Sequence, residues 1–195
     1  MTGIIILAAG SSSRFGSPKQ NLVYQGKTLL QRAIQTALTS ACCDCAVVVL
    51  GANEGQIRPN ISDQQINIIY NPDWQEGMAS SIRLGIAQLL YLEPLVTSAI
   101  LMLCDQPFVD PLLLYQLTAR KTENDAGIIA CEYKNTLGVP ALFDKKYFLQ
   151  LMKLTGSEGA KTVINANPDD VMSVPFSLGA IDIDTIEDFE RLNRG

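Results

Sequence analysis

Two cationic side chains follow a loop of small residues that comes directly after an apolar run near the start of the chain. The run, residues 4–7, is short, β-branched and followed by glycine, which is typical of a strand buried on both faces. Gly10 and the serines after it expose backbone N–H groups at little steric cost, and Arg14 and Lys19 add positive charge. The loop is therefore expected to bind the phosphates of a nucleoside triphosphate.

The spacing of this loop differs from the two common phosphate-binding fingerprints. Gly16 is followed by Ser17, Pro18 and Lys19, whereas a P-loop would continue with Lys and then Ser or Thr. The sequence also has no G-x-G-x-x-G string. The pattern argues against a P-loop ATPase, and a plain glycine turn with two solvated cations is the alternative interpretation.

A carboxylate stands at the end of another apolar run. Residues 99–103 predict a strand, and the string C-D-Q-P that follows places Asp105 at the carboxyl tip of that strand. Carboxylate oxygens suit Mg²⁺, which usually bridges substrate phosphates. Asp105 is thus the first candidate for a metal ligand. The alternative is a helix cap, but Asp110, directly before Pro111, is better placed for that role.

Two further aspartates alternate near the end of the chain, in the string I-D-I-D-T-I-E-D-F. Asp182 and Asp184 would point to the same side of an extended segment. Asp184, just before the predicted last helix, is the better candidate for a second metal ligand. Capping of that helix is the alternative.

A glycine and serine run, G-M-A-S-S-I-R-L-G over residues 77–85, follows the third predicted strand and opens a helix. Its backbone groups and the hydroxyls of Ser80 and Ser81 are suited to contact a base and ribose. A helix N-cap would explain one of the serines but not the whole run.

Apolar runs and helical stripes alternate along the chain, and they supply the elements that would position these residues. Strands are predicted at 4–7, 46–50, 66–70 and 99–103, with helices over 29–38 after an N-cap at Thr28, from about Ile82, and after Pro111. Beyond residue 125 the expected elements are strands near 127–131, 139–143 and 171–174, helices near 144–154 and 157–165, and a last helix from Thr185.

This alternation predicts a single α/β domain over residues 1–195, with a mostly parallel central sheet between two helical layers. Ligand sites in such sheets form at the carboxyl ends of the strands, so the loops after Leu7, Tyr70 and Leu103 are expected to meet in one crevice. Residues 1–110 would form the nucleotide-binding part. Residues 111–195 would bind the acceptor and supply the second metal ligand.

Composition narrows the class of function. The chain has 195 residues, 47% of them hydrophobic, a formal net charge of −5 and a pI near 4.7. This balance argues against a nucleic-acid or anionic-membrane surface, where basic patches supply the affinity. A membrane span and a signal peptide are not predicted, so the expected location is the cytoplasm.

The sequence contains no histidine, which excludes Ser-His-Asp hydrolysis and His-based zinc chemistry. Phosphoryl-type transfer survives this exclusion, because its attacking phosphate is already ionised. The five cysteines are expected to be free thiols. Cys42, Cys43 and Cys45 cluster, but a zinc site would need a fourth ligand at a recognisable spacing.

Several strings resemble a known family. L-A-A-G-S-S-S-R-F-G-S-P-K is similar to the signature L-A-A-G-x-S-x-R-x-G-x-x-K of nucleotidyltransferases that activate sugars, isoprenoid precursors and molybdopterin. The strings G-M-A-S-S-I-R-L-G-I, C-D-Q-P-F-V-D, G-V-P-A-L-F, G-S-E-G-A-K and D-I-D-T-I-E-D-F resemble, in the same order, the molybdenum cofactor cytidylyltransferases and other MobA-like NTP transferases. The resemblance covers nearly the whole chain.

This resemblance implies a three-layer α/β/α, Rossmann-like nucleotidyltransferase fold of the nucleotide-diphospho-sugar transferase type. It also implies magnesium at Asp105 and Asp184, and catalytic roles for Lys19, Arg14 and Asp105. The implied nucleotide contacts are Leu7, Ala8, Ala9, Gly10, Ser11, Arg14, Lys19, Gly77, Ser80 and Ser81.

The implied reaction is Mg²⁺-dependent transfer of CMP from CTP to molybdopterin, with release of pyrophosphate. Guanylyltransferase relatives read L-A-G-G where this chain has Ala9, so the match favours cytidine. The alternatives are another NTP, a sugar phosphate or other phosphorylated acceptor, and a non-catalytic cofactor carrier that serves a molybdoenzyme. A nicotinamide oxidoreductase would also fit the α/β alternation, but the chain lacks the glycine fingerprint. Lys161 in G-S-E-G-A-K is either a contact for the acceptor phosphate or a solvated lysine.

Overall fold

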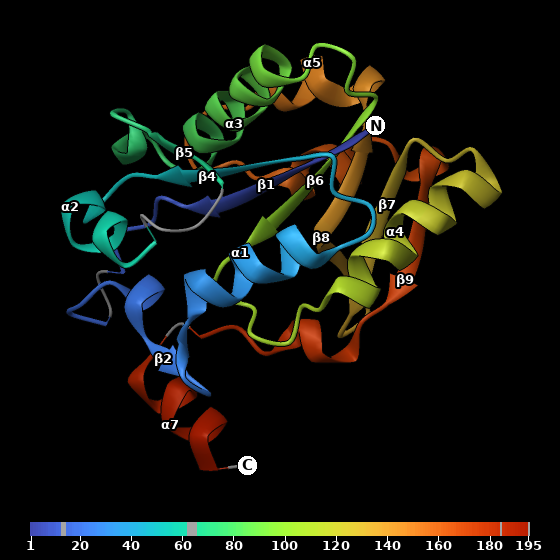
Figure 1. The fold of residues 1–195 in the computed structure, drawn as a ribbon. Helices are drawn as coiled ribbons and strands as arrows, with labels where there is room; N and C mark the ends of the chain where they lie inside the picture. The colour runs from blue at the N-terminus through green and yellow to red at the C-terminus, as the bar shows by residue number, and fades with distance from the viewer. Residues whose placement is uncertain (13–14, 62–65, 184, 195) are drawn as a thin grey trace.

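The computed structural model describes residues 1–12, 15–61, 66–183 and 185–194. Two predicted site residues, Arg14 and Asp184, therefore lie outside the described residues. Within the described ranges, seven strands form one sheet in the order β5-β4-β1-β6-β8-β7-β9 (Figure 1). These strands are β1 (Thr2–Ala8), β4 (Cys45–Leu50), β5 (Asn67–Tyr70), β6 (Ser98–Leu103), β7 (Ile128–Tyr133), β8 (Thr136–Asp144) and β9 (Val171–Pro175).

The sheet is mostly parallel, as predicted, and β8 is the exception. It runs antiparallel to both β6 and β7. A two-residue turn explains this reversal: Lys134 and Asn135 join β7 to β8 with φ values of 48° and 56°, the left-handed conformation typical of tight hairpin turns. The sequence Lys-Asn lacks the usual glycine signal for such a turn.

Helices cover both faces of the sheet, which confirms the three-layer α/β/α fold. In Figure 1, α1 (Leu29–Thr39) and α4 (Pro111–Asn124) lie on one face, and α3 (Met78–Leu92) and α5 (Phe148–Leu151) on the other. The remaining segments are α2 (Glu54–Ile57), α6 (Ala160–Ala166), α7 (Ile186–Arg194), the strand pair β2 (Val23–Tyr24) and β3 (Lys27–Thr28), and the 3-10 turns η1 (Lys19–Asn21), η2 (Arg58–Asn60), η3 (Trp74–Glu76), η4 (Lys145–Tyr147), η5 (Pro168–Asp170) and η6 (Ser177–Ala180).

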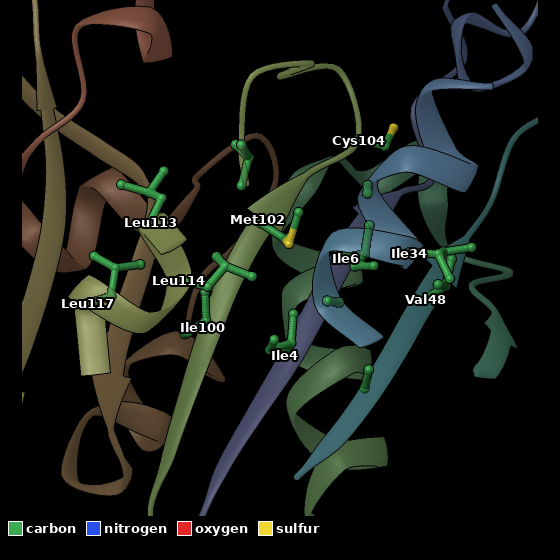
Figure 2. Packing of buried hydrophobic residues seen from close by; sticks show 14 of the residues in the cluster. Ile4, Ile6, Ile34, Val48, Ile100, Met102, Cys104, Leu113, Leu114 and Leu117 are labelled. Atoms are coloured by element: carbon green, nitrogen blue, oxygen red, sulfur yellow. The ribbon is translucent and has the colours of Figure 1, made fainter. Parts of the chain in front are cut away.

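The core is split by the sheet into two apolar clusters, because successive side chains of a strand point to opposite faces. Ile4 and Ile6 of β1 pack with α1 and α4, as Figure 2 shows. Ile5 and Leu7 belong to the cluster under α3, α5 and α6. Burying such a side chain fully contributes roughly 1.5–3 kcal/mol. Burial on both faces explains why the central strands read as unbroken apolar runs.

Side-chain caps fix the starts of two helices where the sequence predicts them. The Thr28 hydroxyl accepts a hydrogen bond from the Gln31 N–H (3.1 Å), and the Gln31 side chain accepts one from the Thr28 N–H (2.9 Å). At α4, the Asp110 carboxylate accepts from the Leu113 N–H (2.8 Å). Asp110 is thus the cap of α4, so Asp105 is not needed for that role.

The predicted helix over 144–154 is wrong in extent. Asp144 ends β8, and its carboxylate accepts a hydrogen bond from the Lys146 N–H (3.0 Å), which starts the short turn η4 ahead of α5. The helix expected over 157–165 begins at Ala160, after a loop with two glycines. In the described part of the chain, no helix combines the length and apolar character needed to cross a membrane.

Candidate active site at the carboxyl edge of the sheet

A cavity of about 400 Å³ lies beyond the carboxyl ends of β1 and β6 and beside the start of α3. The loops after Leu7, Tyr70 and Leu103 contribute to it, so their predicted convergence is confirmed. The lining residues are Leu7, Ala8, Ala9, Gly10, Ser11, Lys19, Gln20, Trp74, Gln75, Gly77, Met78, Ser81, Leu103, Cys104 and Asp105. Its size is within the range of small-molecule sites.

A buried glutamine holds the first loop in shape. Gln20, 1% exposed, donates hydrogen bonds from Nε2 to the carbonyl oxygens of Ala8 (2.9 Å) and Gly10 (3.0 Å). Its Oε1 accepts from the Ser12 hydroxyl (3.2 Å), and that hydroxyl accepts from the Lys19 N–H (3.1 Å). The side chain of Gln20 therefore joins both ends of the loop and fixes where Lys19 leaves it.

Lys19 and Asp105 meet in this cavity. The Lys19 ammonium forms an ion pair with Oδ2 of Asp105, and both side chains are largely buried. The other carboxylate oxygen, Oδ1, is buried and accepts no hydrogen bond from any described group. A buried carboxylate oxygen without a donor fits the ligand set of a hard cation such as Mg²⁺.

The segment that carries the later aspartates lies against Asp105. The Ile183 N–H donates a hydrogen bond to the carbonyl oxygen of Asp105 (3.2 Å), and Gln106 Nε2 donates to the carbonyl oxygen of Gly179 (3.3 Å). Ile183 is flanked by Asp182, which is exposed, and by Asp184, which lies outside the described residues. Among the described residues, no group of three Cys, Asp or Glu side chains forms a ready metal cluster.

The glycine and serine run forms the opposite wall of the cavity. Gly77 has φ 125°, a conformation that favours glycine, and Ser81 lines the cavity while its hydroxyl accepts from Asn71 Nδ2 (2.9 Å). Ser80 does not line the cavity. Its hydroxyl is 2.9 Å from the carbonyl oxygens of both Asp73 and Gly77 and accepts from Asn71 Nδ2. The Ser80 side chain therefore stabilises the turn between Asp73 and Gly77 without facing the cavity.

Besides Leu103, the last residue of β6, five lining residues have no predicted role. Gln20 directly follows Lys19, the last residue of the L-A-A-G signature, and no sequence pattern marks it, because its role depends on how the loop folds. Cys104 precedes Asp105, and burial, with the adjacent carboxylate, raises the pKa of its thiol to about 12. The thiol thus stays neutral and forms part of the wall. The other three, from the loop after β5 and the start of α3, are Trp74, Gln75 and Met78.

Lys161 and the clustered cysteines lie outside this cavity lining. The exposed ammonium of Lys161 donates to the Thr136 hydroxyl (2.7 Å), which places it over the start of β8. All five cysteines are free. Burial and the neighbouring Cys42, Cys45 and Asp44 raise the pKa of Cys43 to about 12.

The fold, with a cavity beyond the first parallel strands, is that of a Rossmann-like nucleotidyltransferase. The MobA-like NTP transferase domain matches residues 4–171, and the chain belongs to this family. It is 24% identical to the molybdenum cofactor cytidylyltransferase of Escherichia coli (strain K12), over 95% of this chain and 92% of the relative. It is also 27% identical to nicotine blue oxidoreductase of Paenarthrobacter nicotinovorans, over 98% of this chain and 96% of the relative.

Among solved structures, Rv0371c from Mycobacterium tuberculosis H37Rv is 28% identical, with a TM-score of 0.83 and coverage of 100% of this chain and 98% of the other. The same mycobacterial protein has been solved as a complex with manganese, with a TM-score of 0.81 to this chain.

Proposed function

We propose that this nucleotidyltransferase transfers CMP from CTP to molybdopterin in a Mg²⁺-dependent reaction that releases pyrophosphate. The observation that carries the proposal is the meeting of Lys19 and Asp105 in one cavity, between the L-A-A-G loop and the glycine and serine run. The similarity to a molybdenum cofactor cytidylyltransferase over almost the full length of both chains supports this choice of acceptor and nucleotide.

The chain's own residues have separable tasks in this proposal. Lys19 and Arg14 neutralise the negative charge that develops toward the leaving pyrophosphate. The backbone of Gly10 and Ser11 faces the phosphates, and Gly77 and Ser81 face the base and ribose. An ionised acceptor phosphate attacks the α-phosphorus in line, so no general base is required, in keeping with a chain that lacks histidine.

Asp105 and Asp184 are the residues proposed to hold Mg²⁺. Oδ1 of Asp105 is buried and has no hydrogen-bond partner among the described residues, which fits this role. The hydrogen bond from the Ile183 N–H to the Asp105 carbonyl oxygen holds the segment that precedes Asp184 against Asp105. When bound, the ion neutralises phosphate charge and helps to orient the triphosphate. The manganese complex of Rv0371c supports the choice of a divalent cation.

Residues 1–110 are proposed to bind the nucleotide and residues 111–195 the acceptor. Ala9 is buried in the cavity wall, where its carbonyl oxygen accepts from the Ala52 N–H (3.1 Å), and it is the residue proposed to favour cytidine. Lys161 is the candidate contact for the acceptor phosphate. A molybdoenzyme is the proposed recipient of the product.

A pyrophosphate-release assay tests the proposal directly. The purified protein is incubated with Mg²⁺, each of the four nucleoside triphosphates, and either molybdopterin or sugar phosphates. Release with CTP and molybdopterin alone, with the dinucleotide product identified by mass spectrometry, is the expected result. Preference for GTP would overturn the role of Ala9, and a sugar-phosphate product would overturn the acceptor. No release with any pair would favour a cofactor carrier.

Oxidoreduction in the same cavity is a second candidate function, because the chain is 27% identical to nicotine blue oxidoreductase. The absence of a G-x-G-x-x-G string argues against a nicotinamide dinucleotide bound in the usual way. Oxidation of reduced nicotinamide cofactors in the presence of nicotine blue, with no pyrophosphate released from any triphosphate, would favour this function over the first.

A further inference from the structure

An ion pair outside the cavity ties the glycine and serine run to a distant loop. The Arg83 guanidinium donates to both carboxylate oxygens of Glu76, with Nη1–Oε1 and Nη2–Oε2 distances of 2.7 and 2.6 Å. This two-pronged geometry fixes orientation as well as distance. Each partner favours the charged form of the other: Arg83 lowers the pKa of Glu76, and Glu76 raises the pKa of Arg83. Glu76 directly precedes Gly77, and Arg83 lies six residues further on, so the ion pair joins the two ends of the segment that contributes to the cavity wall.

The same two side chains bind the backbone of residues 154–156. Arg83 Nη1 also donates to the carbonyl oxygen of Leu154 (2.8 Å), and the Gly156 N–H donates to Glu76 Oε1 (3.2 Å). A third bond runs between backbones, from the Ala79 N–H to the carbonyl oxygen of Gly156 (3.2 Å). The loop is itself braced, because Glu158 accepts from the N–H and the hydroxyl of Thr155 at 2.7 and 3.1 Å.

The two backbones approach so closely at Gly77 that only glycine fits at this position, because a Cβ atom there would lie 2.3 Å from the carbonyl oxygen of Gly156. A Cβ atom on Gly159 would meet only the flexible end of the Met78 side chain, 2.9 Å from its Sδ. Gly77, Met78 and Ser81 line the cavity, whereas Gly156 and Gly159 do not. A displacement of residues 155–159 would therefore move the cavity wall with it.

We propose that Glu76, Arg83 and the loop 155–159 form a positioning clamp that holds Gly77 and Ser81 in place and so sets nucleotide affinity and base preference. The inference rests on the proposal that the cavity binds the nucleotide. The proposed clamp also gives a role to the G-S-E-G string over residues 156–159, which contacts the residues of the cavity wall but does not line the cavity. Neither Glu76 nor Arg83 lines the cavity, so both are positioning residues and not catalytic ones.

Calorimetric titration of the whole protein with each of the four triphosphates, in the presence of Mg²⁺, tests the clamp without any acceptor. Glu76→Ala and Arg83→Met are expected to weaken CTP binding on the order of tenfold, because small displacements of positioning groups have large effects. They should also reduce the differences in affinity among the four triphosphates. Arg83→Lys should restore only part of the affinity, since lysine lacks the fork geometry. The double variant should lose no more than the worse single one.

Two further variants separate positioning from general loss of stability. Glu158→Ala loosens the loop without touching Glu76, and it should change base preference in the same direction. Lys121→Met breaks a comparably buried ion pair, Lys121 to Asp144 at 2.6 Å, away from the cavity, and should lower the melting temperature but leave CTP affinity unchanged. Unchanged affinity and base preference in the clamp variants would overturn the clamp alone. If the unmodified protein binds no triphosphate, the proposed function fails and takes the clamp with it.

Discussion

The ammonium group of Lys19 and the carboxylate of Asp105 form an ion pair, although 86 positions separate the two residues in the sequence. Their meeting follows from the sheet: β1 and β6 are parallel neighbours in which Leu7 pairs with Leu103, so the loops that follow start at the same edge. A cation expected to bind phosphate thus lies against a carboxylate expected to bind metal. Each prediction about one of these residues therefore involves the other.

Asp105→Asn is expected to lower the rate of pyrophosphate release by about a hundredfold or more, because it removes the charge that would hold the metal ion. The substitution also removes the charge partner of Lys19, so triphosphate binding should be less affected than turnover. Steady-state kinetics at several Mg²⁺ concentrations measure both. Asp110→Asn is the matched control, because asparagine caps a helix as well as aspartate does. Half of the original rate in Asp105→Asn would contradict the metal role.

Lys19→Met is expected to weaken CTP binding by roughly ten- to a hundredfold, since a charge-assisted hydrogen bond contributes about 1.5–3 kcal/mol. Methionine keeps the apolar stem and removes only the charge. Calorimetric titration with CTP gives the affinity, and Lys153→Met, at an exposed position, controls for loss of a surface charge. An affinity equal to that of the control would show that Lys19 does not contact the triphosphate.

Residues with a local signal were predictable from the sequence. Thr28 and Asp110 cap helices where the sequence places them, because capping depends on neighbours within one turn. The edge of the sheet where the site forms was also predictable, since parallel strands deliver their loops to one side. The reversal of β8 was not, because its turn is made by Lys134 and Asn135 without glycine.

The roles of Gln20 and Ser80 depend on contacts that no sequence pattern carries. Gln20 binds carbonyl oxygens 10 and 12 positions away, and both depend on how the loop closes. Ser80 and Ser81 look equivalent in the sequence, but the helix turn points one hydroxyl behind the wall and leaves the other residue in the cavity lining. The roles of Arg14 and Asp184 stay predictions, since both lie outside the described residues.

Gln20→Ala is expected to destabilise the fold by about 2 kcal/mol, because it removes the donor to the buried carbonyl oxygen of Ala8 and to the partly buried one of Gly10. It should also weaken CTP binding, since the loop between Ala8 and Ser12 loses its brace. Chemical denaturation gives the first quantity and calorimetry the second. Gln150→Ala, which removes an exposed glutamine paired with Asn167, is the control and should change neither by much. A loop that binds CTP equally well without Gln20 would refute the brace.

Gly77→Ala is expected to impair folding or CTP binding severely, for two independent reasons. Alanine is strained at φ 125°, and its Cβ would lie 2.3 Å from the carbonyl oxygen of Gly156. Gly55→Ala is the control, because it meets no atom within 4 Å and has no positive φ. Denaturation midpoints and CTP titrations of both variants measure the effect. Equal behaviour of the two variants would mean that the turn at Gly77 relaxes without cost.

Acid stability is expected to depend on Asp170, the last residue of η5, which binds the residue ahead of β7 and two residues of η4. Its carboxylate accepts hydrogen bonds from Lys146 (2.6 Å), the Tyr147 hydroxyl and the Gly127 N–H (2.9 Å). These donors lower the pKa of Asp170 from its usual 3.8 to about 2. Because the folded pKa lies below the unfolded one, the stabilisation is complete above the unfolded pKa and is lost as the pH falls through the folded one.

Asp170→Asn should therefore be less stable than the unmodified protein near neutral pH, by about 1 kcal/mol after allowance for solvent screening of this partly exposed group. The difference should shrink below the usual aspartate pKa and vanish only below the folded value of about 2. Urea denaturation of both proteins across this pH range measures it. Asp169→Asn, at the exposed neighbouring position, is the control for loss of one surface charge and should leave stability near neutral pH almost unchanged. A stability gap between Asp170→Asn and the unmodified protein that stays constant with pH would mean that Asp170 acts through shape alone, because only a shifted titration makes the gap close in acid.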